Sequence, residues 1–305
     1  MKTGPRIAAF LTALAVVFAV AVWVGKAFGP QGDITVPAHP TGHDARTAAQ
    51  QPGGLQASRG GYTLALAQSI PSAEPNSPLR FRILDDARAP VLHFEESHEK
   101  LVHLIVVRND LTGFQHLHPV LDDRGTWNVP VDFSRAGDYR VFADFVPAGG
   151  PALTLSANVH VAGPYQPRPL PAVDASSTVD DYTVTLRGSP KAGEGSTLTL
   201  TVNRNGTPVD DLQPYLGAYG HLVALRAADL AYLHVHPIGE PGDGVTPAGP
   251  TVDFHTTFPS AGEYRLFLDF RHGDKVRTAE FTVLVDPSGQ QHSPTQEHGG
   301  DGHGH

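Results

Sequence analysis

A segment that begins with histidine and ends in His-x-His-Pro occurs twice in this sequence. The first copy, HLIVVRNDLTGFQHLHP, runs from His103 to Pro119, and the second, HLVALRAADLAYLHVHP, runs from His221 to Pro237. Each copy contains an apolar run, a short polar turn and a second strand-like run, which is the pattern of a β-hairpin. One offset, 118 residues from His103 to His221, pairs the histidines of the two copies: His103 with His221, His116 with His234 and His118 with His236.

Strand-like runs surround both copies at a spacing typical of β-sandwich domains. LRFRIL, TWNVPVDF and YRVFADF belong to the first half, and STLTLTVN, TVDFHTTF and YRLFLDF belong to the second. The residues AGDY and AGEY resemble the tyrosine corner of immunoglobulin-type sandwiches, with Tyr139 and Tyr264 bonding back to nearby backbone. The sequence therefore predicts an all-β chain with two tandem immunoglobulin-like or cupredoxin-like β-sandwich domains.

The N-terminal residues have the pattern of a membrane anchor. Lys2 and Arg6 precede an apolar run from Ile7 to Val24, and 18 residues in a helix span about 27 Å, close to the hydrocarbon thickness of a bilayer. No clear small-x-small cleavage site follows, so residues 1–29 are predicted to form an uncleaved signal-anchor transmembrane helix, with cleaved secretion as the alternative. The positive-inside rule then places the rest of this single-pass protein outside the cytoplasm, at the cell membrane.

The other boundaries follow from composition. Few large apolar residues occur between the anchor and the first sandwich or after the second, which predicts flexible segments there. The tail is expected to be a disordered, low-affinity metal-scavenging tract through His298, His303 and His305, or a solvated tail without a role. The expected segments are a linker at 30–60, sandwich domain 1 at 61–163, a Pro-rich linker at 164–176, sandwich domain 2 at 177–286 and a His-rich tail at 287–305.

Charge and sulfur content exclude several classes of function. The net charge is -9, and the surface outside the N-terminal segment is more acidic still, so it repels phosphate backbones and nucleic-acid binding is not expected. The chain has no cysteine and a single methionine, Met1. Disulfides, zinc–thiolate sites, thiol nucleophiles and blue-copper centres are therefore excluded. Any metal must be held by histidine, carboxylate or backbone oxygen.

The repeated hairpin can bring three imidazoles together. If the strands pair around a turn at residues 109–113, His118 falls opposite His103, and opposed residues lie about 4.5–5.5 Å apart. His116 and His118 point to the same face, about 6.6 Å apart at Cα. Three such imidazoles can converge on one ion with metal–nitrogen bonds of about 2.0–2.1 Å. Imidazole-rich sites without sulfur suit copper or zinc. The predicted sites are His103, His116 and His118 in the first repeat and His221, His234 and His236 in the second.

Asp144 and Asp269 are charged residues within otherwise apolar strands, at equivalent places in the two repeats. An unpaired buried carboxylate is costly, so each needs a partner. We expect them to support the imidazole rings as outer acceptors. Salt bridges to Arg108 and Arg226 are the alternative, and histidines that only pin the hairpin through hydrogen bonds are the alternative to a metal site.

No catalytic motif accompanies the histidines. The sequence has no G-x-S-x-G elbow, no H-E-x-x-H and no Gly-rich phosphate loop, so an enzyme is not predicted. His93, Glu95, Glu96 and His98 form a polar cluster in the first repeat only, which we interpret as a solvated strand end or a weak additional metal site.

The segments PYLGAYGHLVALRAADLAYLHVHP and GEYRLFLDF of the second repeat resemble a group of bacterial, largely actinobacterial, membrane-anchored or secreted proteins named as heavy-metal-binding or copper-associated. The resemblance implies a β-sandwich fold and an extracytoplasmic, metal-linked role. It covers the second repeat strongly and the first through internal repetition, because HFEESHEKLVHLIVV stands where the second repeat has the Y-L-G-A segment.

Together these features favour a membrane-anchored extracytoplasmic protein that binds or buffers copper or zinc through its histidine triplets. Two alternatives remain open. One is a non-metal adhesion or scaffold module, a common use of tandem sandwiches. The other is a copper redox enzyme, which the near absence of methionine disfavours. The sequence does not identify a protein partner.

Overall fold

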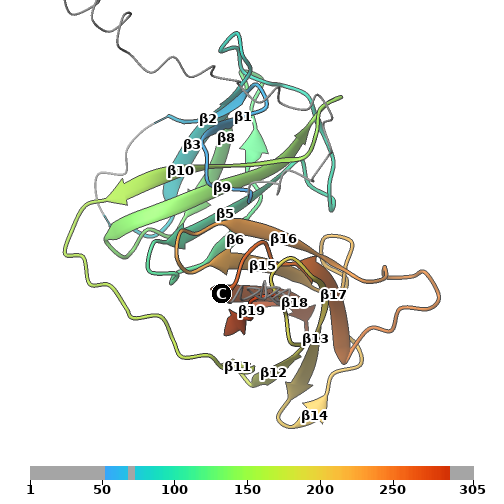
Figure 1. Cartoon of the computed structure of the whole chain (residues 1–305). Coiled ribbons are helices and arrows are strands. Elements are labelled where there is room, and N and C mark those ends of the chain that lie inside the picture. Colours follow the sequence, from blue (N-terminus) through green and yellow to red (C-terminus); the bar gives the residue numbers. More distant parts are fainter. Residues whose placement is uncertain (1–51, 68–72, 289–305) are drawn as a thin grey trace, which may run out of the picture. The chain divides into compact units, whose positions relative to one another are not determined.

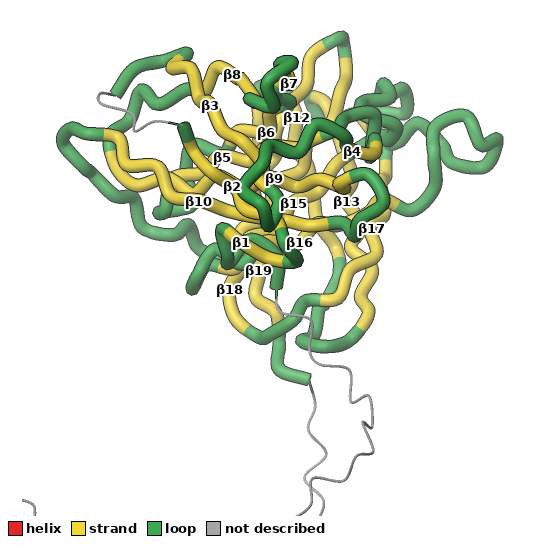
Figure 2. Tube along the Cα trace, turned by 90° about the horizontal axis from the view of Figure 1, so that it is seen from above, coloured by secondary structure: helices red, strands yellow, loops and turns green. Residues whose placement is uncertain are grey.

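The computed structural model of the 305-residue chain describes residues 52–67 and 73–288. The chain separates into two units, Met1–Ala48 and Ala49–His305, and every described residue belongs to the second. The described residues form strands, turns and loops, and no helix among them is long and apolar enough to cross a membrane (Figure 2). The predicted anchor, most of the linker at 30–60 and the three tail histidines lie outside the described residues.

The first repeat forms two antiparallel sheets. One has the strand order β1-β2-β3-β8-β7. The other has the order β10-β9-β5-β6 (Figure 1). The short strand β4 also pairs with β9. The histidine hairpin is the β5–β6 pair. The strands are β1 (Ser58–Arg59), β2 (Tyr62–Leu66), β3 (Ser77–Leu84), β4 (Phe94–Glu95), β5 (Val102–Arg108), β6 (Gln115–Leu117), β7 (Val120–Leu121), β8 (Trp127–Val131), β9 (Gly137–Pro147) and β10 (Leu153–Val161).

The second repeat reproduces this arrangement in one continuous sheet of order β11-β12-β13-β17-β16-β15-β18-β19, with β14 attached to β13. The run β19-β18-β15-β16 is equivalent to β10-β9-β5-β6. Its histidine hairpin is the β15–β16 pair. The strands are β11 (Ser176–Val179), β12 (Tyr182–Arg187), β13 (Gly195–Arg204), β14 (Thr207–Pro208), β15 (His221–Arg226), β16 (Tyr232–Pro237), β17 (Thr251–Thr257), β18 (Gly262–His272) and β19 (Lys275–Val285).

Each repeat has its own apolar core, built from the inward side chains of alternating strands. Phe81, Trp127 and Phe145 belong to the first core, and Phe254 and Phe281 belong to the second. Strands such as β3 and β17 alternate buried and more exposed residues, as expected for strands with one face on a core. The prediction of an all-β fold with tandem immunoglobulin-like sandwiches is confirmed. Strands β1 and β11 begin slightly before the predicted starts of the two domains.

The tyrosine corners are also confirmed. The Tyr139 hydroxyl donates to the Arg135 carbonyl at 2.7 Å, and the Tyr264 hydroxyl donates to the Ser260 carbonyl at 3.0 Å. Each hydrogen bond joins the start of a late strand, β9 or β18, to the loop that precedes it.

The strands that begin with the repeated histidine are buried on both faces. Every residue of β5 is buried, and in β15 only the last is partly exposed. Alternate residues of β5 enter the first core, whereas Ile105 and Val107 point the other way. They join a third apolar cluster that includes Val223 and Leu225 of β15. The two hairpin-bearing sheets therefore pack on each other through their outer faces, and the histidine triplet lies on this side of β5 and β6.

Candidate metal centre

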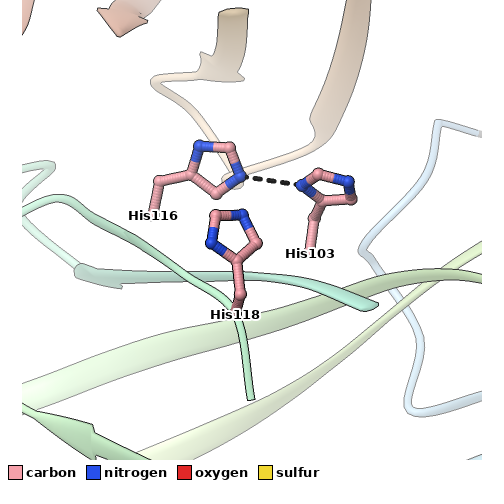
Figure 3. A group of neighbouring side chains, drawn as sticks. All are labelled: His103, His116 and His118. Atoms are coloured by element: carbon pink, nitrogen blue, oxygen red, sulfur yellow. Dashed lines mark hydrogen bonds between the residues drawn. The ribbon is translucent and has the colours of Figure 1, made fainter. Parts of the chain in front are cut away.

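The first-repeat triplet converges as the spacing predicts. In the β5–β6 ladder Leu104 pairs with Leu117, which places His103 opposite His118. The ring centroids of His103, His116 and His118 lie 4.9–5.3 Å apart, and one nitrogen from each ring lies within 4.8 Å of the others. Figure 3 shows the three rings turned toward one another. These residues form a group that could hold a metal ion.

Two hydrogen bonds determine which nitrogens of the triplet carry protons. Nε2 of His103 lies 2.9 Å from the Ser97 carbonyl oxygen, which can only accept, so Nε2–H is the donor. Nδ1 of His116 lies 2.8 Å from Oδ2 of Asp269, and the carboxylate likewise accepts from Nδ1–H. In the neutral rings, Nδ1 of His103 and Nε2 of His116 therefore carry lone pairs.

These two lone-pair nitrogens face each other at 3.0 Å. Two lone pairs repel, so a contact of this length requires a shared proton or a metal ion between the rings. In a tetrahedral site with metal–nitrogen bonds of about 2.0–2.1 Å, ligand nitrogens lie about 3.3 Å apart. The observed spacing of His103 and His116 is close to that value. Outer hydrogen bonds that fix the tautomer in this way are typical of metal-ligating histidines.

His118 supplies the third imidazole. Its Nε2 atom is buried and has no hydrogen-bond partner among the described residues, which is uncommon for a buried polar atom and costly without a ligand. Burial and the neighbouring imidazoles of His116 and His103 lower the pKa of His118 to about 3. The ring is therefore neutral at physiological pH, which is the state that binds a metal ion.

The second repeat builds the first part of its triplet in the same way. Nε2–H of His221 donates to the Tyr215 carbonyl at 2.7 Å, just as His103 donates to Ser97, and in both cases the acceptor lies six residues earlier. Burial lowers the pKa of His221 to about 4. Val223 pairs with His234 in the β15–β16 ladder, so the backbone register places His236 opposite His221. The side chains of His234 and His236 lie outside the described part of the structure.

The two predicted carboxylates lie beside the hairpins, but Asp269 serves a histidine of the other repeat. Asp269 accepts from the Thr278 hydroxyl at 2.6 Å and from His116 of the first repeat. Asp144 is the neighbour of His103 in the β5–β9 ladder and accepts from the Thr154 hydroxyl at 2.9 Å. Asp144 is also hydrogen-bonded to the hydroxyl of Tyr232, whose burial raises its pKa well above the usual value.

The arginines that were the alternative partners bind other carboxylates. Nε of Arg108 donates to Asp110 at 2.9 Å, and Nε of Arg226 donates to Asp229 at 2.8 Å. Both aspartates stand in the turn of their own hairpin. The pairs with Asp144 and Asp269 that the sequence allowed are thus replaced by local pairs, which the spacing of two or three residues would have indicated.

His98, which the sequence left as a solvated or weakly binding residue, lies beside the triplet. Its ring centroid is 6.0 Å from that of His103 and 5.5 Å from that of His221. His221 in turn lies 6.3 Å from His116. The other members of the predicted polar cluster, His93, Glu95 and Glu96, are exposed. Imidazoles from both repeats therefore gather in one place within the unit that contains the two sandwiches.

A domain family described as a domain of unknown function, DUF8832, matches this fold twice, at residues 57–163 and 177–287. The two matches correspond to the two sandwiches and cover well over half of the chain. The chain thus belongs to this family and consists of two of its domains in tandem. No curated protein matches the chain.

Several solved structures are similar to it. A DUF4426 family protein from Pseudomonas aeruginosa PAO1 has a TM-score of 0.27 and 10% identity, over 38% of this chain and 99% of that one. InvD of Yersinia pseudotuberculosis has a TM-score of 0.25 and 16% identity, over 76% of this chain and 59% of that one. Invasin, a bacterial integrin-binding protein, has a TM-score of 0.21 and 16% identity, over 72% of this chain and 39% of that one. At these scores the similarity carries no argument about function.

Proposed function

We propose that this protein binds a copper or zinc ion through His103, His116 and His118 and serves to bind or buffer the metal. The observation that carries this proposal is the convergence of three imidazole rings, each with one nitrogen within 4.8 Å of the others. Hydrogen bonds to Ser97 and Asp269 turn lone pairs of His103 and His116 toward each other at 3.0 Å. Buried Nε2 of His118, beside them, has no partner in the described part of the chain.

The ligand set suits copper or zinc. Imidazole favours these metals, whereas calcium and magnesium prefer oxygen ligands. The chain has no cysteine and only one methionine, so thiolate and thioether ligands that would select Cu(I) are not part of the site. Binding and buffering are proposed in place of catalysis because no motif for a nucleophile or a phosphate loop accompanies the histidines.

The proposed location is the outer face of the cell membrane, with residues 1–29 as the anchor. Its support is the sequence pattern of Lys2 and Arg6 before an apolar run. The resemblance to proteins named as heavy-metal-binding or copper-associated agrees with a metal-linked role there. The acidic surface supports the absence of nucleic-acid partners.

The test is the metal content of the full-length chain after equilibration with zinc or copper and removal of the excess. Because histidines of the tail bind metal whatever the domains do, the measurement uses a chain in which they are replaced, called here the tail-substituted chain. It is expected to hold about two ions, one for each triplet. H118A should lose one of them, and H118A/H236A should lose both. The tail substitutions are H292A, H298A, H303A and H305A.

H160A is a matched control for these substitutions. His160 also pairs with an aspartate, Asp138, at 2.7 Å, but its side chain is 74% exposed and it belongs to no group of described residues that could hold a metal ion. Its removal should leave the metal content unchanged. Unchanged metal content in a folded H118A chain would contradict the proposed site.

A non-metal adhesion or scaffold module is the second candidate. It is favoured by the protein hydrogen bonds of His103 and His116, which would pin the hairpins in a purely structural role. Tandem β-sandwiches are also the architecture that such modules commonly use. This candidate predicts that H118A alters stability while the parent chain binds no copper or zinc.

A further inference from the structure

Two aromatic pairs of the third apolar cluster join the first repeat to the second. Phe114 of the first repeat stacks on Phe267 of the second, with ring centroids 4.0 Å apart. Phe142 of the first repeat lies 5.4 Å from Tyr232 of the second. Tyr232 is the equivalent of Phe114, and Phe267 is the equivalent of Phe142, so the two pairs are related by exchange of the repeats. The third apolar cluster therefore has approximate twofold symmetry.

The equivalent carboxylates Asp144 and Asp269 are related by the same exchange of the repeats. Asp269 stands on β18 of the second repeat, yet it holds Nδ1–H of His116 in the first. Its side chain is 5% exposed and its other oxygen accepts from Thr278, so its position is well defined. Asp144 on β9 is hydrogen-bonded to Tyr232 of the second repeat. Each carboxylate thus contacts a side chain of the opposite hairpin.

We propose that the metal centre links the two repeats, because each carboxylate positions the histidine triplet of the opposite repeat. This arrangement is called here the crossed arrangement of carboxylates. Asp269 positions the first triplet, and by repeat equivalence Asp144 positions the second, so that metal binding stabilises the docking of the two sandwiches. This proposal rests on the proposed metal binding. Asp269 is a positioning residue: it fixes the tautomer and orientation of His116 without contacting the ion.

Thermodynamic linkage determines how strongly metal binding and docking of the two repeats affect each other. Loss of an outer acceptor of a ligating histidine costs about 10–100-fold in metal affinity. Separation of the repeats would withdraw Asp269 from His116 and have the same consequence. Because coupling between two binding events is reciprocal, the ion must strengthen docking by the same factor by which docking strengthens ion binding.

The first experiment compares the two carboxylates in two backgrounds of the tail-substituted chain. The first-site background carries H234A and H236A, and the second-site background carries H116A and H118A. Zinc affinity is measured by competition with a chromophoric chelator. In the first-site background, D269A should weaken zinc binding by about 10–100-fold, and D144A should weaken it much less, because Asp144 does not hold a ring nitrogen of His116. In the second-site background the effects of D144A and D269A should be exchanged.

D269N separates positioning from a general structural role. Asparagine keeps an oxygen that accepts from Nδ1–H of His116, so zinc affinity should lie between that of D269A and that of the first-site background. The free energy of unfolding of the metal-free variants is measured in parallel. Equal zinc affinities for D269A and D144A in the first-site background would overturn the crossed arrangement.

The second experiment measures docking directly. The chain has no cysteine, so V120C in the first repeat and L284C in the second can each take one spin label, at side chains that are 71% and 53% exposed. In the first-site background, added zinc should narrow the distribution of distances between the labels, and D269A should abolish this narrowing. If a chain that binds zinc shows a distance distribution that zinc does not change, the proposed link between metal binding and docking of the repeats is overturned. A chain that binds neither zinc nor copper would instead overturn the proposed function.

Discussion

The two histidine hairpins share a backbone arrangement but differ in what surrounds it. In both hairpins, the histidine that begins the motif, His103 or His221, donates Nε2–H to a carbonyl six residues earlier. In both, the strand register also places this histidine opposite the last histidine of the motif. Three features differ: the burial of the arginine–aspartate ion pair in the hairpin turn, one aromatic position in the second strand, and the residues of the turn that precedes the hairpin. The shared features are those that a three-imidazole site needs, and the differences can be used to probe each copy separately.

The arginine–aspartate ion pairs of the two hairpin turns differ in burial, because the Pro-rich linker contacts the first of them. The side chains of Arg108 and Asp110 are 2% and 5% exposed, whereas those of Arg226 and Asp229 are 18% and 39% exposed. The carbonyl of Gln166 accepts from Arg108. The Pro-rich segment after the first repeat therefore folds over the first hairpin turn, and no equivalent segment covers the second among the described residues.

The largest expected effect comes from breaking the buried pair. R108A should lower the free energy of unfolding by about 3–5 kcal/mol, because Asp110 is then left buried without its partner. R226A should cost about 0–1 kcal/mol, since its pair is partly exposed. Denaturant unfolding of the full-length chain measures both. Equal losses for the two variants would show that the linker does not distinguish the hairpins.

Acid should destabilise the metal-free chain through the neutral histidines. The pKa of His221 is about 4 in the folded state, because of burial, against an ordinary value of 6.5. The unfolded state therefore binds more protons below pH 6.5, and stability is lost as the pH falls from there toward 4. At about 1.4 kcal/mol per pH unit, this one group removes about 3 kcal/mol over that range.

H221Q isolates this contribution, because glutamine can still donate to the Tyr215 carbonyl and does not titrate. Its loss of stability between pH 6.5 and 4 should be smaller than that of the parent chain. His118, whose pKa is lowered to about 3 by burial and by the neighbouring imidazoles, acts in the same direction. An identical pH profile in H221Q, measured by denaturant unfolding at each pH, would contradict the buried neutral state of His221.

Local features of the centre could be predicted from the sequence. The turn between Arg108 and Phe114 and the alternation of the following strand determine that His103 faces His118, and both are short-range properties. The tyrosine corner is equally local. The role of Ser97 was not predicted, because its backbone carbonyl is the acceptor and leaves no sequence signal.

The hydrogen bond between His116 and Asp269 depends on how the two repeats pack together. The spacing of residues along the sequence does not indicate this packing. Asp269 lies 153 residues from His116. One signal was present nevertheless: HLIVV and HLVAL lack the polar alternation of a strand with one solvated face, and continuous apolar runs indicate burial on both faces. That pattern predicts a second layer over each hairpin, although it does not identify the layer.

The aromatic position gives a smaller effect. Tyr232 has a hydroxyl that is hydrogen-bonded to Asp144, and its equivalent Phe114 has none. Y232F should lower the free energy of unfolding by about 1.5–3 kcal/mol, the usual contribution of a hydrogen bond to a charged group. It should also raise the zinc affinity of the second triplet, because a competing donor to Asp144 is removed. Y62F, at a partly buried tyrosine of the first core, is the control and should leave zinc affinity unchanged.

The smallest expected effect lies in the turns that carry the carbonyl acceptors. Both turns have positive φ at their two central residues, as a type I′ turn requires: His98 (48°) and Glu99 (61°) in the first repeat, Leu216 (54°) and Gly217 (75°) in the second. Glycine occupies only one of these positions, so the first repeat has the more strained turn. E99G should therefore raise the free energy of unfolding by up to about 1 kcal/mol.

G217A makes the opposite change at the equivalent position. An added Cβ would meet only Oε1 of Glu99, at 3.9 Å, so space is sufficient and the cost is purely conformational. G217A should lower the free energy of unfolding by about 1 kcal/mol, as measured by denaturant unfolding. Zinc affinity of the first triplet should be the same in E99G as in the parent, because the Ser97 carbonyl still accepts from His103. A fall in that affinity would mean that strain in the turn, and not the hydrogen bond alone, orients the imidazole.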